Sequence, residues 1–284
     1  MINLTVFANF FIDTEERFLR MEDSFKSFSS ISANRWVINV RGRYSTRTLD
    51  FLRLHLGDKL FSYELNSEEG WFADVRTMLK HINGEYVFFW LEDHINLGKT
   101  DLLEKIVEEM QEKDLEYMLY SFWQNGRLRQ RYNGISLTTG TYVDFFEYNI
   151  SNHSIIQSNV GGSYIISVAA IFKLSLFKKI ILADDPIPKR WPKQTPFDFE
   201  KSPQDTHWLP IKMALSKQEL FASIDDDHEC EGYSLQARGL YPIREGRKSY
   251  AVTENVAGKS LISYIINKSS HLRVEIKSLF KRYL

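Results

Sequence analysis

The sequence predicts an α/β fold with a mainly parallel central sheet flanked by helices. Two observations carry this prediction: short apolar runs alternate with amphipathic segments over the first 125 residues, and the run YVFFWL (86–91) is apolar at every position. A strand that is apolar on both faces is typical of the middle of a parallel sheet covered by helices. The 284 residues are enough for one large domain or for a domain with an appended lobe.

The first half of the chain repeats a strand-then-helix unit. Apolar residues recur at helical spacing between the strands, and Asp13 with Glu16, Gly57 and Asn83-Gly84 mark helix ends. One more helix is expected after Thr100. The predicted strands are INLTVFANFF (2–11), RWVINV (35–40), LFSYEL (60–65), YVFFWL (86–91) and EYMLYSFW (116–123).

The second half is less regular. Strands with turns are expected after Trp123, and SYIISVAAIFKLSLFKKIILA (163–183) predicts a buried strand or helix followed by a helix. Residues 184–210 hold six of the seven prolines, which indicates a surface segment. Residues 268–284 predict a basic amphipathic helix with five Lys or Arg against one Glu.

Composition excludes some classes of function. The 36 basic and 37 acidic residues leave no global field that would attract nucleic acid. The single cysteine, Cys230, rules out an internal disulfide, and the chain does not open on a secretory signal, so we expect a cytoplasmic protein. The longest apolar stretch, 164–176, is interrupted by Ser167 and Lys173 and is too short to span a bilayer.

Three residues that handle metals or protons, Glu92-Asp93-His94, directly follow the buried run. In open α/β sheets, ligands bind outside the carboxyl ends of the strands. The triplet lies at such an end, and residues 11–13, 41–46 and 66–70 follow neighbouring strands. We therefore expect these three loops to lie beside the triplet.

Over residues 3–123 this order of elements, with NGEYVFFWLEDHINL (83–97), resembles the GT-A-fold glycosyltransferases, particularly inverting family 2. The resemblance implies a Rossmann-like nucleotide-sugar-binding half (1–125) and, in the same domain, an acceptor-side half that completes the site (126–267). It also implies the transfer of a sugar from a nucleotide-sugar to a hydroxyl of a glycan or lipid-linked acceptor, with inversion.

In that family the acidic triplet is the D-x-D motif, which holds a divalent cation, Mn²⁺ or Mg²⁺, against the leaving diphosphate. By resemblance, Glu92 or Asp93 contacts the ribose or metal-bound water, and the third position, here His94, ligates the metal. Imidazole suits Mn²⁺ better than Mg²⁺. A histidine at the third position therefore leaves three alternatives: the metal preference shifts, Asp93 becomes the main ligand, or metal is dispensable. In the structural alternative, Asp93 caps a turn and His94 packs on the sheet edge.

The loop after the second strand departs from the family. Arg41 and Arg43 stand where the family has an acidic loop for the nucleobase, and arginine accepts no hydrogen bonds. These arginines could hold a phosphate or could be solvated loop cations. Asp13 is the remaining acidic candidate near the base, with helix capping as the alternative role.

Candidates for the rest of the site come from the second half. An inverting transfer needs a carboxylate that removes the acceptor's proton, and we favour Glu200, which follows the apolar anchor Phe199, with Asp198 as an alternative. By resemblance, His228 could complete the metal shell and Arg238 could reach the diphosphate. Solvated charges on loops are the alternative for each.

Partners and rival functions follow from the same features. The terminal helix suits an anionic membrane surface, as expected of a peripheral enzyme with a lipid-linked acceptor, or it docks on its own domain. One rival function is a catalytically inactive binding or scaffold protein of the same fold. Another is a sugar nucleotidyltransferase, which the absence of glycine after the first strand disfavours. Nucleic acid is not an expected partner.

Overall fold

The computed structural model describes residues 2–98, 101–119, 130–159, 162–183, 196–201, 205–224, 234–236 and 238–241, without the side chains of 197 and 198. Residues Met1–Tyr241 form one compact unit, and Pro242–Leu284 are assigned to a second. The predicted helix at 268–284 lies outside the described residues. In the described part of the chain, no helix has both the length and the apolarity that a membrane span requires.

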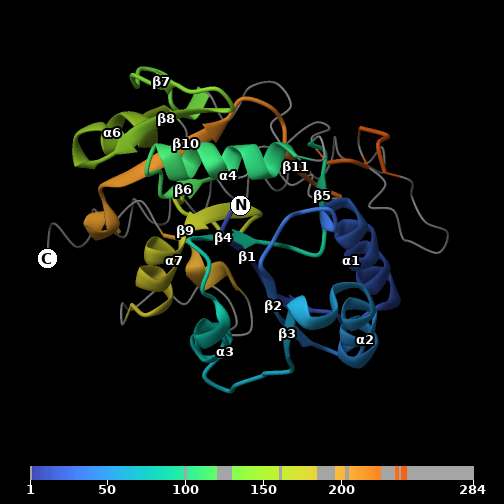
Figure 1. The fold of residues 1–284 in the computed structure, drawn as a ribbon. Coiled ribbons are helices and arrows are strands. Elements are labelled where there is room, and N and C mark those ends of the chain that lie inside the picture. Colours follow the sequence, from blue (N-terminus) through green and yellow to red (C-terminus); the bar gives the residue numbers. More distant parts are fainter. Residues whose placement is uncertain are drawn as a thin grey trace, which may run out of the picture. The chain divides into compact units, whose positions relative to one another are not determined.

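Within the described residues, a central sheet of nine strands runs in the order β3-β2-β1-β4-β9-β6-β10-β8-β7 (Figure 1). A separate pair is formed by β5 (His94–Asn96) and β11 (Phe221–Ser223). The strands of the central sheet are β1 (Leu4–Phe11), β2 (Arg35–Arg41), β3 (Leu60–Tyr63), β4 (Tyr86–Phe89), β6 (Tyr117–Met118), β7 (Thr138–Thr139), β8 (Val143–Tyr148), β9 (Ala170–Lys173) and β10 (Ile211–Ser216).

The predicted α/β fold is confirmed, and the sheet is mixed. Strands β3, β2, β1 and β4 are parallel, as the strand-then-helix repeat predicts. Strand β9 comes from the second half of the chain and lies antiparallel between β4 and β6. The 163–183 segment is therefore a strand followed by a helix, which settles the choice that the sequence left open.

Helices cover both faces of the sheet. Helices α1 and α2 lie on one face, where Phe25 of α1 packs on Trp36 of β2 and on Phe51 of α2. Helix α4 is tied to the segment just after α1, because the Glu104 carboxylate accepts the backbone N–H of Ser32. Helices α3 and α7 lie on the other face. The helices are α1 (Glu15–Phe28), α2 (Ser45–Leu56), α3 (Trp71–Met78), α4 (Leu102–Glu112), α6 (Ile150–Asn159) and α7 (Leu174–Ile181), with short 3₁₀ turns at Gly57–Lys59, Leu79–His81, Pro196–Phe199 and Thr206–Trp208.

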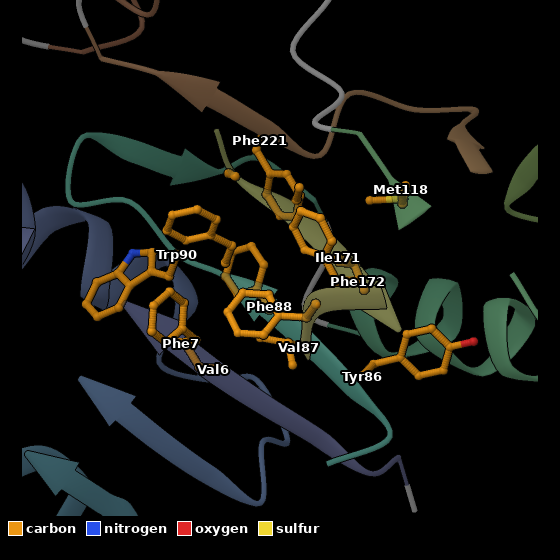
Figure 2. Close-up of a cluster of buried hydrophobic side chains, with 14 of the residues drawn as sticks. Val6, Phe7, Tyr86, Val87, Phe88, Trp90, Met118, Ile171, Phe172 and Phe221 are labelled. Carbon is orange, nitrogen blue, oxygen red and sulfur yellow. The ribbon is translucent and has the colours of Figure 1, made fainter. Parts of the chain in front are cut away.

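Strand β4 is buried on both faces, which explains why its sequence is apolar at every position. On one face, Phe88 stacks on Phe221 of β11 with ring centroids 5.1 Å apart (Figure 2). On the other face, Phe89 contacts Phe7 of β1 at 5.3 Å and Phe199 at 5.7 Å. The strand that leads to the candidate site is thus fixed in the centre of the core.

Candidate functional site

The acidic triplet lies in a tight connection between β4 and β5. Glu92 and Asp93 form a turn, and His94 begins β5, a strand that the sequence analysis did not predict. His94 pairs with Ser223 of β11, and the Asp93 carbonyl accepts the backbone N–H of Ile224 at 2.8 Å. Backbone hydrogen bonds therefore hold the triplet on the side facing β11.

Helix α1 holds the same connection from the other side. The Ser24 hydroxyl accepts the Trp90 indole N–H at 2.8 Å and donates to the carbonyl of His94. One turn further, the Ser27 hydroxyl accepts the backbone N–H of Asn96 at 3.0 Å. Two serines on one face of α1 thus fix both ends of the connection that presents the carboxylates.

Arg17, in the first turn of α1, joins the ends of β1 and β4. Its Nη1 donates to the Phe11 carbonyl at 2.9 Å and lies 3.9 Å from Glu92 Oε1, and its Nε lies 3.5 Å from Asp13 Oδ1. Thr14, rather than Asp13, caps the helix by accepting the backbone N–H of Arg17. The loop at 11–13 is therefore beside the triplet, and the capping role considered for Asp13 is wrong.

The loop after β2 packs against the loop after β1. Gly42 has φ of +98°, and a Cβ atom there would lie 2.5 Å from the Ile12 carbonyl oxygen, so this close approach requires glycine. Arg41 is 5% exposed, and its guanidinium lies 5.9 Å from the ring centre of Phe11. Arg41 is therefore not a solvated loop cation, whereas Arg43 is exposed.

Charges from two other elements act on Arg41. Burial lowers the pKa of Arg41, while the carboxylates of Asp74 on α3 and of Glu92 oppose that shift. Asp74 is 2% exposed, and its Oδ1 accepts the backbone N–H of Ser67 at 3.0 Å. The loop at 66–70 is thus tied to α3, and a buried Asp acts on Arg41, the last residue of β2.

Two asparagines form a polar layer at the carboxyl ends of β1 and β2. Asn39 Nδ2 donates to Asn9 Oδ1 at 2.9 Å, and Asn39 Oδ1 accepts the backbone N–H of Leu65 at 2.7 Å. Asn9 Nδ2 and Asp74 Oδ2 are buried and have no hydrogen-bond partner among the described residues. Buried polar atoms of this kind are usually satisfied by water or a ligand. Neither asparagine was predicted from the sequence to belong to the site, although Asn9 interrupts an apolar strand.

The two carboxylates of the triplet differ in acidity. Burial, together with the adjacent Asp93 charge, raises the pKa of Glu92 to about 7. Burial also disfavours the charge on Asp93, but the charge and hydrogen bond of His94, the charge of Arg20 and a backbone hydrogen bond together outweigh burial and lower the pKa of Asp93. Asp93 is therefore the stronger acid of the two, and it becomes negatively charged at a lower pH than Glu92 does.

His94 lies behind Asp93. Its Nδ1 is 2.7 Å from Asp93 Oδ1, and its side chain is 4% exposed, against 35% for Asp93. Among the described residues, no group of three or more His, Cys, Asp and Glu side chains is arranged to hold a metal ion. His228, proposed to complete the metal shell, is outside the described residues.

The other predicted residues come from the second half of the chain. Glu200 Oε1 accepts the Ser167 hydroxyl at 3.1 Å, and the preceding Phe199 is fully buried. The side chain of Asp198 is outside the described residues. Arg238 forms a bidentate pair with Glu219 at 2.6 and 2.9 Å, so its guanidinium already has a carboxylate partner.

The described part of the chain has an α/β fold with a mixed central sheet, and this fold is GT-A-like. Among solved structures, the chain is similar to S. aureus TarS (residues 1–349), a GT-A glycosyltransferase, with 15% identity and a TM-score of 0.50 over 78% of this chain and 60% of TarS 1–349. The TarS 1–349 complex with UDP-GlcNAc gives 16% identity and a TM-score of 0.50 over 82% of this chain and 60% of that chain.

These matches establish the fold, and the chain spans about three fifths of the TarS 1–349 structures that it matches. The mannosyltransferase PcManGT from Pyrobaculum calidifontis, in complex with GDP-Man and Mn²⁺, gives 13% identity and a TM-score of 0.44 over 79% of this chain and 57% of that chain. No family model matches the sequence, and a search of curated proteins found no match.

Proposed function

We propose that the protein is a glycosyltransferase that moves a sugar from a nucleotide-sugar donor to an acceptor hydroxyl, with inversion. The observation that carries the proposal is the pair Glu92 and Asp93, held at the end of the central strand of a GT-A-like sheet, with Asp13 and Arg41 beside it. Loops at the carboxyl ends of parallel strands are where α/β folds bind nucleotides.

In this proposal, the nucleobase of the donor binds at the carboxyl ends of β1 and β2. Asp13 remains a candidate there, and the buried polar atoms of Asn9 and Asp74 add a donor and an acceptor. Of the arginines predicted from the sequence, Arg41 and the exposed Arg43 remain candidates for a phosphate. Arg238 is a weaker candidate because it is paired with Glu219.

A divalent cation, Mn²⁺ or Mg²⁺, fits the carboxylate pair. Glu92 and Asp93 are neighbours whose repulsion contributes to the raised pKa of Glu92, and a bound cation would relieve that repulsion. Asp93 would be the main ligand, with Glu92 beside it and His228 as a further candidate. We assign His94 to orienting Asp93 through their 2.7 Å contact, a common role for residues behind metal ligands. The cation would neutralise charge on the leaving diphosphate.

Glu200 is the proposed catalytic base. In a single displacement, its carboxylate would take the proton of the acceptor hydroxyl while the oxygen attacks the anomeric carbon and the bond to the diphosphate breaks. The burial of Phe199 against Phe89 supports this choice, because it anchors residue 200 near the end of β4. Asp198 is the alternative base.

The proposed activity can be tested without knowing the acceptor. Water can replace the acceptor hydroxyl, so we expect slow release of nucleoside diphosphate from one nucleotide-sugar among UDP-, GDP- and TDP-sugars. Glu200→Gln should slow the release while leaving donor binding unchanged. Binding of a donor without any release, in water or with candidate glycan acceptors, would favour the inactive scaffold protein instead.

The acceptor is proposed to be a glycan or lipid-linked saccharide, reached at the cytoplasmic side of an anionic membrane. The support is the basic amphipathic sequence at 268–284. Charge reversal at Lys277, Lys281 and Arg282 should reduce flotation with vesicles containing phosphatidylserine or phosphatidylglycerol and leave the weak binding to phosphatidylcholine vesicles unchanged. Equal binding of the variant and the wild type to anionic vesicles would remove the membrane proposal.

A further inference from the structure

We propose that Arg17 binds the sugar-bearing phosphate of the donor and so gives the site a positive charge that does not depend on metal. This inference rests on the proposed function, since it assigns a residue to the donor diphosphate. Neither the acidic triplet nor the sequence patterns around it pointed to Arg17. Two observations support this role for Arg17: the position of its guanidinium, and the single hydrogen bond that its N–H groups make among the described residues.

The guanidinium of Arg17 has donors to spare. An arginine side chain carries five N–H donors in a planar fork that matches phosphate oxygens. Within the described residues, the fork makes one hydrogen bond, to the Phe11 carbonyl at 2.9 Å. The nearest carboxylate oxygens, of Asp13 and Glu92, are 3.5 and 3.9 Å away, at or beyond the limit of a hydrogen bond. Four N–H groups therefore remain for a ligand.

The surroundings of Arg17 also fit a ligand rather than a structural ion pair. Its side chain is 46% exposed, so an anion can reach it, and exposed pairs at such distances contribute little to stability. Other arginines of the described chain are closer to their carboxylates: Arg20 is 2.8 Å from Glu16, Arg47 is 2.6 Å from Glu15, Arg53 is 2.9 Å from Asp50, and Arg238 is 2.6 Å from Glu219.

The position of Arg17 relates it to the leaving group. It bridges Asp13, in the loop after β1, and Glu92, in the turn after β4, which are two acidic residues of the proposed donor site. Two partly engaged carboxylates keep the guanidinium at this edge without saturating it. A diphosphate held beside Glu92 and Asp93 would meet a cation already in place, and Arg–phosphate pairs are among the stronger hydrogen-bonded contacts in proteins.

The test compares nucleoside diphosphates with monophosphates, because a monophosphate lacks the phosphate that Arg17 would hold. Affinities for UDP and UMP, and for GDP and GMP, are measured by calorimetry in EDTA and again with Mn²⁺. In EDTA, we expect wild-type protein to prefer the diphosphate and Arg17→Ala to lose about tenfold of that preference or more, with monophosphate affinity unchanged. Arg17→Lys should keep part of the preference.

Arg53→Ala is the matched control, because Arg53 is also a helical arginine, 51% exposed, and pairs with Asp50 on α2. It should leave the preference for diphosphate unchanged. An unchanged preference in a folded Arg17→Ala protein that still binds both nucleotides would overturn the inference and leave the proposed function standing. Failure of the wild type to bind any nucleotide would overturn both.

Discussion

Asp93→Asn is expected to reduce the release of nucleoside diphosphate from the donor by at least about 100-fold, the usual effect of removing one group that stabilises charge in a transition state. Asparagine keeps the shape of the side chain and can still contact His94 Nδ1, which lies 2.7 Å from Asp93 Oδ1. What is lost is the negative charge, and with it the main proposed ligand for the cation. The measurement is nucleotide release at saturating Mn²⁺.

Asp50→Asn is the matched control for Asp93→Asn. Asp50 is an exposed carboxylate on α2 that pairs with Arg53 at 2.9 Å, and its substitution should leave nucleotide release unchanged. The melting temperature of Asp93→Asn should stay close to that of the wild type, because its backbone contacts remain. Release by Asp93→Asn at the wild-type rate would move the active site away from the triplet.

Trp90→Ala is expected to lower the free energy of unfolding by about 3–5 kcal/mol, as for other large aromatic residues truncated in a core. Trp90 is fully buried, and its ring packs against Phe10, Phe25 and Trp36 with centroids 4.8, 6.2 and 5.5 Å away. Its indole N–H also binds Ser24, the residue that ties α1 to the triplet. Urea unfolding followed by circular dichroism measures the loss.

One further variant separates the contributions of Trp90, and a second serves as a control. Trp90→Phe keeps most of the apolar contact but removes the N–H that Ser24 accepts, so it should cost clearly less than Trp90→Ala. Phe11→Ala is a surface control, since Phe11 is 46% exposed, and it should change the unfolding free energy little. A loss below about 1 kcal/mol for Trp90→Ala would mean that Trp90 does not anchor the connection, because buried aromatic residues cost several times more.

Most of the first half of the fold could be predicted from the sequence, because each element there buries one face or both and so carries a local period. The run at 86–91 and the helix ended by Gly57 are clear cases, and they correspond to β4 and α2. Strand β5 could not be predicted. It has three residues, begins on the polar His94, and pairs with β11, which follows more than a hundred residues later. Such pairing leaves no local pattern.

The candidate site was predictable where a strand end determines it. Glu92 and Asp93 follow a recognisable strand, and the three loops expected beside them follow neighbouring parallel strands. Asp74 and Arg17 were not predictable in the same way, because each lies on a helix whose polar face looks like any solvated surface. Their roles depend on tertiary contacts: Asp74 is buried near Arg41, and Arg17 bridges two loops.

A thermal-shift panel can show directly whether the edge carrying Glu92 and Asp93 holds a nucleotide-sugar. The wild-type protein is heated with UDP-, GDP-, TDP- and CMP-sugars, each in Mn²⁺, Mg²⁺ or EDTA, and Asp93→Asn is heated alongside. We expect one nucleotide to raise the melting temperature of the wild type, most strongly with a divalent cation, and to raise that of Asp93→Asn much less. Stabilisation by no nucleotide under any condition would contradict the claim.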